Sequence, residues 1–464
     1  MLEFVYTLLG GFFTALPFVI AFLLALGLIF LVAGLFMSPL VGAAVILLLL
    51  LVETAQVYLF GLRLGIIVYP QDMLFVPMAL VALIRLMRPG AFARLPKSLW
   101  VLTGVMAVGF LWGLMKYGTT AGVEFRNDFY FITGIFYFSS FAWTRERVAR
   151  LLGWLFPVVL LIMLVVWYRW LADAVGLDWV EPIWRYADTT GVALRVINSQ
   201  QTWMLGLAVI LLVYAMAVGN SLARWYFTLP LLGLTVLVLQ HRSVWVAAFL
   251  PALLAFFIVR QSQGKLASRM LVIVAVTAAI AGPLLATGKF SGATSSVADL
   301  AVRATSTTEG TFVGRVKGWD ALLKQWVAAG PHAWAIGSPY GSGYVREDAS
   351  HAGKEVAYAP HNYYVQLLLR TGVVGLLAFL AFNIYLFRGA IRLAGGPYDK
   401  LTGYAMLGVV MSFALYNIPY SPIYTQGLFM GVILGLILQF QHQPAAREKP
   451  GDAIPTGPVG GRAS

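Results

Sequence analysis

The sequence predicts an all-α polytopic membrane protein with about 12-13 transmembrane helices and one large loop on its outer side. Of the 464 residues, 60% are hydrophobic and only 11% are charged, which is too apolar for a protein surrounded by water alone. Apolar runs of about twenty residues recur along the chain, and each can cross a hydrocarbon core of roughly 30 Å as a helix. The alternation of polar and apolar residues that a membrane barrel needs is absent.

The candidate spans follow from these apolar runs. They lie at about 4–36, 40–60, 71–88, 99–116, 127–143, 148–171, 201–219, 223–240, 243–260, 269–287, 362–387, 401–417 and 422–441. We expect a single transmembrane domain over residues 1–443, which includes the outer loop at 288–361. Residues 444–464, rich in Pro, Gly and Ala, are expected to form a disordered cytoplasmic tail.

The basic residues cluster at the ends of apolar runs, and this sets the orientation. The clusters are Arg85, Arg88, Arg94 and Lys97; Arg145, Arg147 and Arg150; Arg260, Lys265 and Arg269; Arg388, Arg392 and Lys400; and Arg447 and Lys449. Placing them all in the cytoplasm satisfies the positive-inside rule from residue 85 onward. The side of the N-terminus stays open, because three spans before Arg85 put Met1 outside and four put it inside. Segments 172–200, 240–243 and 288–361 then lie outside, where we expect the function.

The net charge of +13 does not indicate a nucleic-acid-binding protein, because the cations form no patch with interleaved aromatic residues. Cysteine is absent, which excludes a disulfide, a thiolate nucleophile and a cysteine-ligated metal. We find no close acidic or histidine motif for a metal, no Walker A sequence, no nucleophile elbow and no dinucleotide fingerprint. A soluble nucleotide or a metal is therefore disfavoured, and no cofactor is predicted.

The long outer loop contains ordered elements by its pattern. Between residues 313 and 329, apolar side chains recur at helical spacing, which predicts an amphipathic helix with Arg315 near its start. A Gly-rich turn at 336–344 then returns the chain toward the membrane. Pro360 breaks the preceding structure, so a helix is expected to begin just after His361.

The first turns of that helix carry a polar stripe. Asn362, Gln366 and Arg370 recur every four residues and share one face, which should point to the protein interior or to a wet cavity. His361 itself is as readily a structural histidine as a base.

Two outer arginines are candidate phosphate ligands, because a guanidinium offers a permanently charged fork. Arg242 lies in the outer turn at 240–245, where an interfacial arginine with its stem in lipid is also ordinary. Arg315 has the alternative of a solvated helix charge. Arg195, in the earlier outer segment, is a weaker candidate, since most such arginines face water or pair with acids.

In this order, these residues resemble the O-antigen ligase and polymerase superfamily of bacterial envelope glycan transferases. The shared pattern covers about residues 200–390. It runs from Arg242 in an outer turn to Arg315 followed by Trp319, then the turn at 336–337, and last His361 and Asn362 with Gln366 and the 372–375 glycine step. Residues 363–365 depart from it, because a leucine often follows the histidine motif.

The resemblance implies a GT-C-like fold with one large periplasmic loop, in the inner membrane of a Gram-negative bacterium. It implies a glycosyltransferase that takes a glycan from undecaprenyl diphosphate, with inversion and without a metal. His361 then matches the family's general base, and Arg242 and Arg315 match its two essential arginines. Asn362, Gln366, Arg370 and, more weakly, Arg195 are expected to bind substrate.

Three related transferases share these parts and differ in the acceptor. We favour the ligase, whose acceptor is lipid A-core in lipopolysaccharide biosynthesis, because one outer loop dominates late in the chain and three spans follow it. A polymerase, or a protein O-oligosaccharyltransferase, is the alternative. A lipid-linked glycan flippase is the competing class, although no inverted repeat is found and the polar residues gather on one side of the membrane.

Overall fold

The computed structural model describes residues 26–55, 62–63, 67–174, 196–218, 221–239, 241–258, 311–348, 351–357, 359–395 and 400–442. The α-helices among them are residues 26–37, α2 (Pro39–Thr54), α3 (Pro70–Leu86), α4 (Ala91–Arg94), α5 (Lys97–Tyr117), α6 (Thr119–Ser139), α7 (Arg145–Ala174), α8 (Ser199–Val218), α9 (Leu229–Val238), α10 (Arg242–Ile258), α13 (Thr311–Ala328), α14 (Pro331–Ile336), α15 (Tyr363–Gly395), α16 (Lys400–Tyr416) and α17 (Tyr424–His442). A 3-10 helix, η1 (Ser221–Thr228), precedes α9.

Two short antiparallel hairpins are the strand structure of these residues. In the first, β1 (Leu62–Arg63) pairs with β2 (Ile67–Val68). In the second, β3 (Val345–Asp348) pairs with β4 (His351–Ala357), with a register shift at Glu347 and Asp348. Neither hairpin forms part of the helix bundle, so the predicted all-α polytopic membrane fold is confirmed.

Among the described residues, five helices are long and apolar enough to cross a membrane, namely α5, α7, α8, α15 and α17. Shorter apolar helices accompany them at 26–37, 39–54, 225–238, 243–254 and 400–416. The predicted total of about 12-13 spans counts runs that lie wholly or partly in 1–25 and 259–310, outside the described residues. That total, the domain boundaries and the predicted tail therefore stay predictions.

The helix starts show where hydropathy alone misplaced a boundary. α6 begins at Thr119 rather than near residue 127, because Glu124 and Asp128 in its first half have partners inside the protein. α2 begins where predicted, with Pro39 as its first residue and Ser38 as its N-cap, whose hydroxyl oxygen accepts from Leu40 N at 3.3 Å.

α6 and α17 cross at very short range, and three glycines allow it. A Cβ atom at Gly427 would lie 2.7 Å from the carbonyl oxygen of Phe131, and one at Gly431 would lie 2.7 Å from that of Gly134. Such close backbone approach through small residues is how membrane helices gain packing energy without a hydrophobic driving force. This pair is therefore a rigid part of the bundle.

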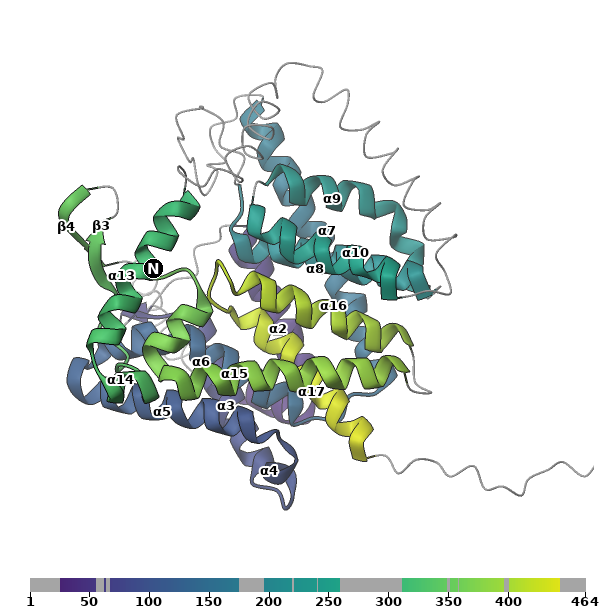
Figure 1. Ribbon diagram of the computed structural model, residues 1–464. Coiled ribbons are helices and arrows are strands. Elements are labelled where there is room, and N and C mark those ends of the chain that lie inside the picture. Colours follow the sequence, from purple (N-terminus) through teal and green to yellow (C-terminus); the bar gives the residue numbers. More distant parts are fainter. Residues whose placement is uncertain are drawn as a thin grey trace, which may run out of the picture.

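The bundle is organised around α8, which is almost entirely buried and packs against α7, α9, α10 and α16. α15 lies between α5 and α16, and these helices run side by side across Figure 1. Helices α13 and α14 and the β3–β4 hairpin gather at the left of that view, at the end where α15 begins. We call this the loop end of the bundle.

Candidate functional site

The Gly-rich turn at 336–344 docks into the bundle against a break in α15. Gly372, inside α15, has a non-helical backbone with φ 62°, and a Cβ atom there would lie 2.3 Å from the carbonyl carbon of Ala335. Gly337 has φ 80°, and its Cβ would lie 2.3 Å from the carbonyl carbon of Arg370. Ser338 N donates to Leu369 O at 2.7 Å. Both positions require glycine, for their backbone conformation and for the space.

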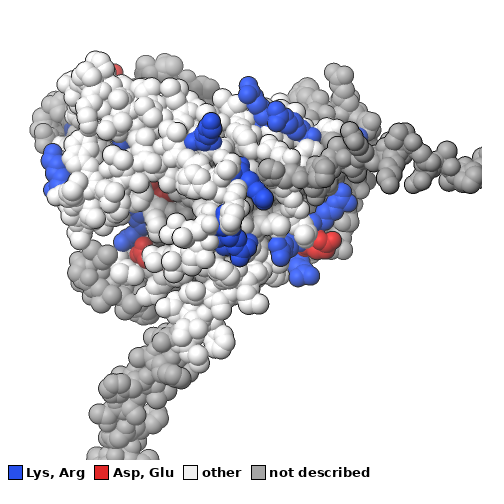
Figure 2. All heavy atoms as spheres, turned by 90° about the horizontal axis from the view of Figure 1, so that it is seen from below, with Lys and Arg blue, Asp and Glu red and all other residues white. Residues whose placement is uncertain are grey.

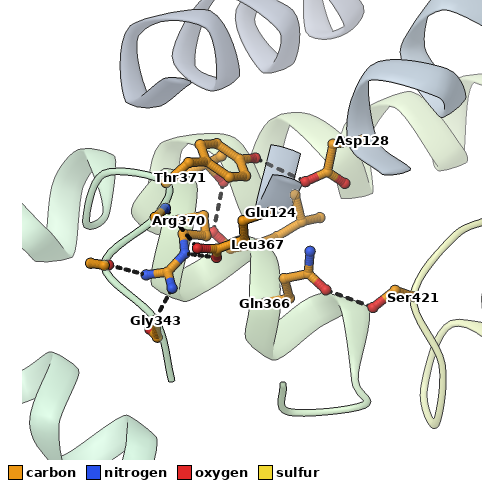
Figure 3. Close-up of polar contacts among 11 residues, drawn as sticks. Glu124, Asp128, Gly343, Gln366, Leu367, Arg370, Thr371 and Ser421 are labelled. Atoms are coloured by element: carbon orange, nitrogen blue, oxygen red, sulfur yellow. Dashed lines mark hydrogen bonds and ion pairs between the residues drawn. The ribbon is translucent and has the colours of Figure 1, made fainter. Parts of the chain in front are cut away.

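Arg370 holds the other half of this turn. Its side chain is 3% exposed and pairs through Nε with the Glu124 carboxylate of α6. Its remaining nitrogens donate to Ser342 Oγ at 2.8 Å and Gly343 O at 2.5 Å (Figure 3). Glu124 in turn accepts from Gly341 N at 2.7 Å. Each charge of this buried pair is thus hydrogen-bonded, as a buried ion pair must be.

The Arg370 guanidinium also lies 4.2 Å from the centre of the Tyr344 ring. Next to it, Tyr340 donates its hydroxyl to Asp128 of α6 at 3.0 Å. The predicted location of Arg370 on an interior face is confirmed. Since its donors are used by the protein, we assign it a positioning role in place of the expected contact with substrate.

Gln366 and Asn362 lie on the same buried face. Gln366 is 7% exposed and accepts a hydrogen bond from Ser421 Oγ at 2.6 Å, which ties α15 to the segment between α16 and α17 (Figure 3). Asn362 is the N-cap of α15, and its Oδ1 accepts from Val365 N at 3.2 Å. The start of α15 is therefore fixed on several sides.

His361 stands directly before this cap, in a left-handed conformation. Its φ of 46° is the one positive value for a non-glycine among the described residues, and such strain costs free energy and concentrates at functional sites. The preceding carbonyl, that of Pro360, accepts a hydrogen bond from Trp319 Nε1 of α13. α13 is thus attached to the residue before His361.

Two guanidinium groups act on this imidazole. The pKa of His361 is held below its usual value, first by burial of the half-buried ring and then by the positive charges of Arg315 and Arg346. A lowered pKa means that the neutral ring, which can accept a proton, prevails at neutral pH. Arg315 also lies over the Tyr420 ring, with 5.9 Å from Cζ to the ring centre.

Arg346 comes from β3, and a glycine gives it room. A Cβ atom at Gly318 would lie 2.8 Å from Arg346 Nε, so the guanidinium rests on α13 one turn from Arg315. The sequence analysis did not single out Arg346 or Tyr420. Gly318, three residues after Arg315, was the available signal in the sequence. It does not identify Arg346 as the neighbour unless the register of the β3–β4 hairpin is known.

Arg242 and Arg195 are less fully described than the residues above. The backbone of Arg242 begins α10, whereas its side chain and the whole of Arg195 lie outside the described residues. His241 beside it bonds Ile197 O through Nε2 at 3.1 Å, and Ser199 and Tyr416 hydroxyls lie 3.2 Å apart. The Tyr416 ring stacks on that of Tyr420 at 4.9 Å. These contacts place the start of α10 near the loop end.

No three His, Cys, Asp or Glu side chains of the described segments come together as metal ligands. The polar groups that do converge are one imidazole, two guanidinium groups and the capped start of a helix.

Fold and site together define a polytopic helical membrane protein with a cationic, imidazole-bearing site at one end of its bundle. Residues 226–380, about a third of the chain, match the family model described as O-antigen ligase. This region of the chain is therefore similar to the O-antigen ligase family, in agreement with the resemblance seen in the sequence. Members of this family are ligases or polymerases of glycosyltransferase type. A search of curated proteins finds no match.

The matched region has a clear relation to the site. It begins in η1 and ends inside α15, so it contains Arg242, Arg315, Arg346, His361 and the whole Gly-rich turn. Tyr420 and Ser421 lie beyond it, on the segment that closes the site from the C-terminal side.

Proposed function

We propose that this protein is an O-antigen ligase, which transfers a glycan from undecaprenyl diphosphate to lipid A-core. The reaction takes place at the periplasmic face of the inner membrane of a Gram-negative bacterium. The observation that carries the proposal is the placement of the half-buried His361 near Arg315 and Arg346: burial first, and then these two positive charges, hold the pKa of the imidazole below its usual value. The same site thus offers positive charge to an anionic leaving group and a base to the acceptor hydroxyl.

In the proposed reaction the acceptor hydroxyl attacks the anomeric carbon on the face opposite to the diphosphate. A new C–O bond forms as the bond from this carbon to the phosphate oxygen breaks, which inverts the configuration. The hydroxyl proton passes to the neutral imidazole of His361. The electron pair of the broken bond leaves with undecaprenyl diphosphate, whose negative charge Arg315 and Arg346 stabilise, together with Arg242 in our assignment.

The remaining site residues have supporting roles in this proposal. Asn362 and Gln366 orient the start of α15 and border the substrate, and Arg370 positions the Gly-rich turn. Arg195 is kept as a weaker substrate ligand. The choice of a ligase is supported by the three helices α15, α16 and α17 after the loop and by the sequence, in which one outer loop dominates late in the chain.

The test uses the purified full chain in liposomes with labelled undecaprenyl-diphosphate glycan and lipid A-core. We expect label on lipid A-core, and a loss of about two to four orders of magnitude in rate for His361→Ala. Label on a lengthened lipid-linked glycan would instead identify a polymerase, and label on protein an oligosaccharyltransferase.

Two outcomes would contradict the transferase mechanism. Retained transfer by His361→Ala would remove the base from the scheme. Movement of the lipid-linked glycan across the membrane, with no acceptor labelled by the parent protein, would identify a flippase. His332→Ala is the matched control, because His332 is an exposed histidine that packs edge-on against Trp112 of α5, with 5.2 Å between ring centres.

A further inference from the structure

A second polar site lies at the end of the bundle opposite to the loop end. It is an open groove of about 570 Å³ between the first turn of α5 and the last turns of α15, and Gln441 of α17 closes one side. α15 is broken at Gly372, and Arg388 in the groove wall lies 16 residues beyond that break, roughly 24 Å along the continuous part of the helix. This length alone covers most of a hydrocarbon core of about 30 Å, and His361 lies on the other side of the break. The groove therefore lies at headgroup depth in the leaflet away from His361.

The groove concentrates positive charge. Lys97, Arg388 and Arg392 all line it, all three are exposed, and none of its lining residues is acidic. The ion pairs recorded among the described residues involve none of them. In Figure 2, which shows the molecule from below, basic side chains clearly outnumber acidic ones, and most lie in the right half of the view.

The placement of these cations is unfavourable without an anion. Arg388 and Arg392 are one turn apart on α15, where like charges repel. Lys97 is the first residue of α5, and a cation at a helix N-terminus opposes the helix dipole. Basic residues at helix ends are ordinary in membrane proteins, but here α5 and α15 bring three of them into one cavity. A bound phosphate would offset both the repulsion between the two arginines and the unfavourable position of Lys97 at the helix N-terminus.

The rest of the lining is suited to a lipid. Ile384, one turn from Arg388 toward the membrane centre, is 51% exposed and lines the groove with Ala381. The hydroxyl of Tyr385 donates to Gln441 Oε1 at 3.1 Å, which gives the groove a firm polar edge. A free inorganic anion would gain nothing from the apolar wall, whereas an acyl chain would cover it.

We propose that this groove binds an anionic phospholipid, with its phosphate among Lys97, Arg388 and Arg392 and an acyl chain along Ile384. Arginine is suited to this role because its fork can hold two phosphate oxygens. The inference is independent of the proposed transferase activity, because it concerns other residues at the other end of the bundle.

Native mass spectrometry of the purified full chain in mild detergent tests it, with phosphatidylglycerol and phosphatidylcholine as probes. We expect tighter retention of phosphatidylglycerol, and a loss of about tenfold or more in its affinity for the variant K97Q/R388Q/R392Q. The control variant R88Q/R94Q/R150Q removes the same charge from three exposed residues outside the groove and should keep the preference. The single variant Arg392→Gln, the mildest change, should lose several-fold.

Three results would overturn the proposal. One is equal retention of both lipids by the parent protein. Another is an equal loss in the control variant, which would reduce the effect to general charge. The third is displacement of phosphatidylglycerol by millimolar inorganic phosphate, which would show that the apolar wall contributes nothing. A thermal unfolding curve for each variant verifies that the compared proteins are folded.

Discussion

At the scale of single residues, the proposed chemistry depends on the pKa of His361, which burial and the neighbouring arginines lower. A neutral imidazole next to two guanidinium groups is a base in a cationic site, and the cations serve two purposes. Together with burial of the ring, they lower the pKa of His361, and in the proposed function they offer positive charge to a diphosphate. The left-handed backbone at His361 fixes the ring just before a capped helix, so little rearrangement is needed before reaction.

The pH dependence of kcat/KM follows from the lowered pKa of His361. A lowered pKa means that the base form is kept as the pH falls and is lost only when the pH drops through the folded-state pKa. We therefore expect the acid limb of the profile below the usual histidine value of about 6.5. In Arg346→Gln one of the depressing charges is gone, so the limb should move to higher pH. An unchanged limb in this variant would contradict the coupling.

Lys324→Gln is the matched control for this profile. Lys324 is an exposed cation on α13 that pairs with Asp320 at 2.6 Å. Its removal also deletes one positive charge from the loop end, and it should leave the acid limb in place.

Substitution of Arg315 tests the geometry of phosphate binding. Lysine keeps the charge but has no fork, so Arg315→Lys should lose about one to three orders of magnitude in transfer rate at saturating acceptor. Lys324→Arg, the reverse exchange on the exposed face of α13, should be neutral. Near-normal transfer by Arg315→Lys would rule out a bidentate role and leave a simple charge.

At the scale of elements, the docked Gly-rich turn is the feature on which the site depends. The turn is held by Gly337 and Gly372 and by the pair of Arg370 with Glu124. Glu124 belongs to α6, which lies more than a hundred residues before the other three in the sequence. Because it lies against the break in α15, the turn also fixes the direction in which the first helical turns, with His361 before them, leave the bundle.

Gly372→Ala should disrupt this docking. Alanine at φ 62° is strained, at a cost of about 1 kcal/mol or more, and its methyl group would collide with the Ala335 carbonyl. We expect a lower thermal unfolding midpoint in detergent and faster proteolysis within 336–344. Gly104→Ala is the control, since a Cβ atom there meets nothing within 4 Å. Equal behaviour of the two variants would show that the turn does not depend on Gly372.

At the scale of the whole molecule, apolar runs predicted most spans to within a few residues, since lipid exposure imposes a strong and local signal. α6 was placed too late because Glu124 and Asp128 lower its hydropathy, and their partners lie more than two hundred residues away. The polar stripe on α15 was correctly placed inside, whereas its partners were not foreseen. The β3–β4 hairpin, and with it Arg346, was missed because strand register depends on tertiary contacts that periodicity does not encode.

The charge balance of the proposed site makes a further prediction for the intact enzyme. If guanidinium groups neutralise the leaving diphosphate, the reaction needs no divalent ion. Dialysis against EDTA should then leave the initial rate of glycan transfer unchanged. A fall of about tenfold that magnesium reverses would show that a metal carries this charge.

The glycine contacts between α6 and α17 have a consequence for how a bulky donor enters. α6 holds the Gly-rich turn through Glu124, and α17 follows the segment whose Ser421 holds Gln366. Because no side chain separates the two backbones, we expect α6 and α17, which form two walls of the site, to move together. If the proposed donor binds at this site, we expect α13 and its neighbouring hairpin, rather than α6 or α17, to move when the sugar chain enters.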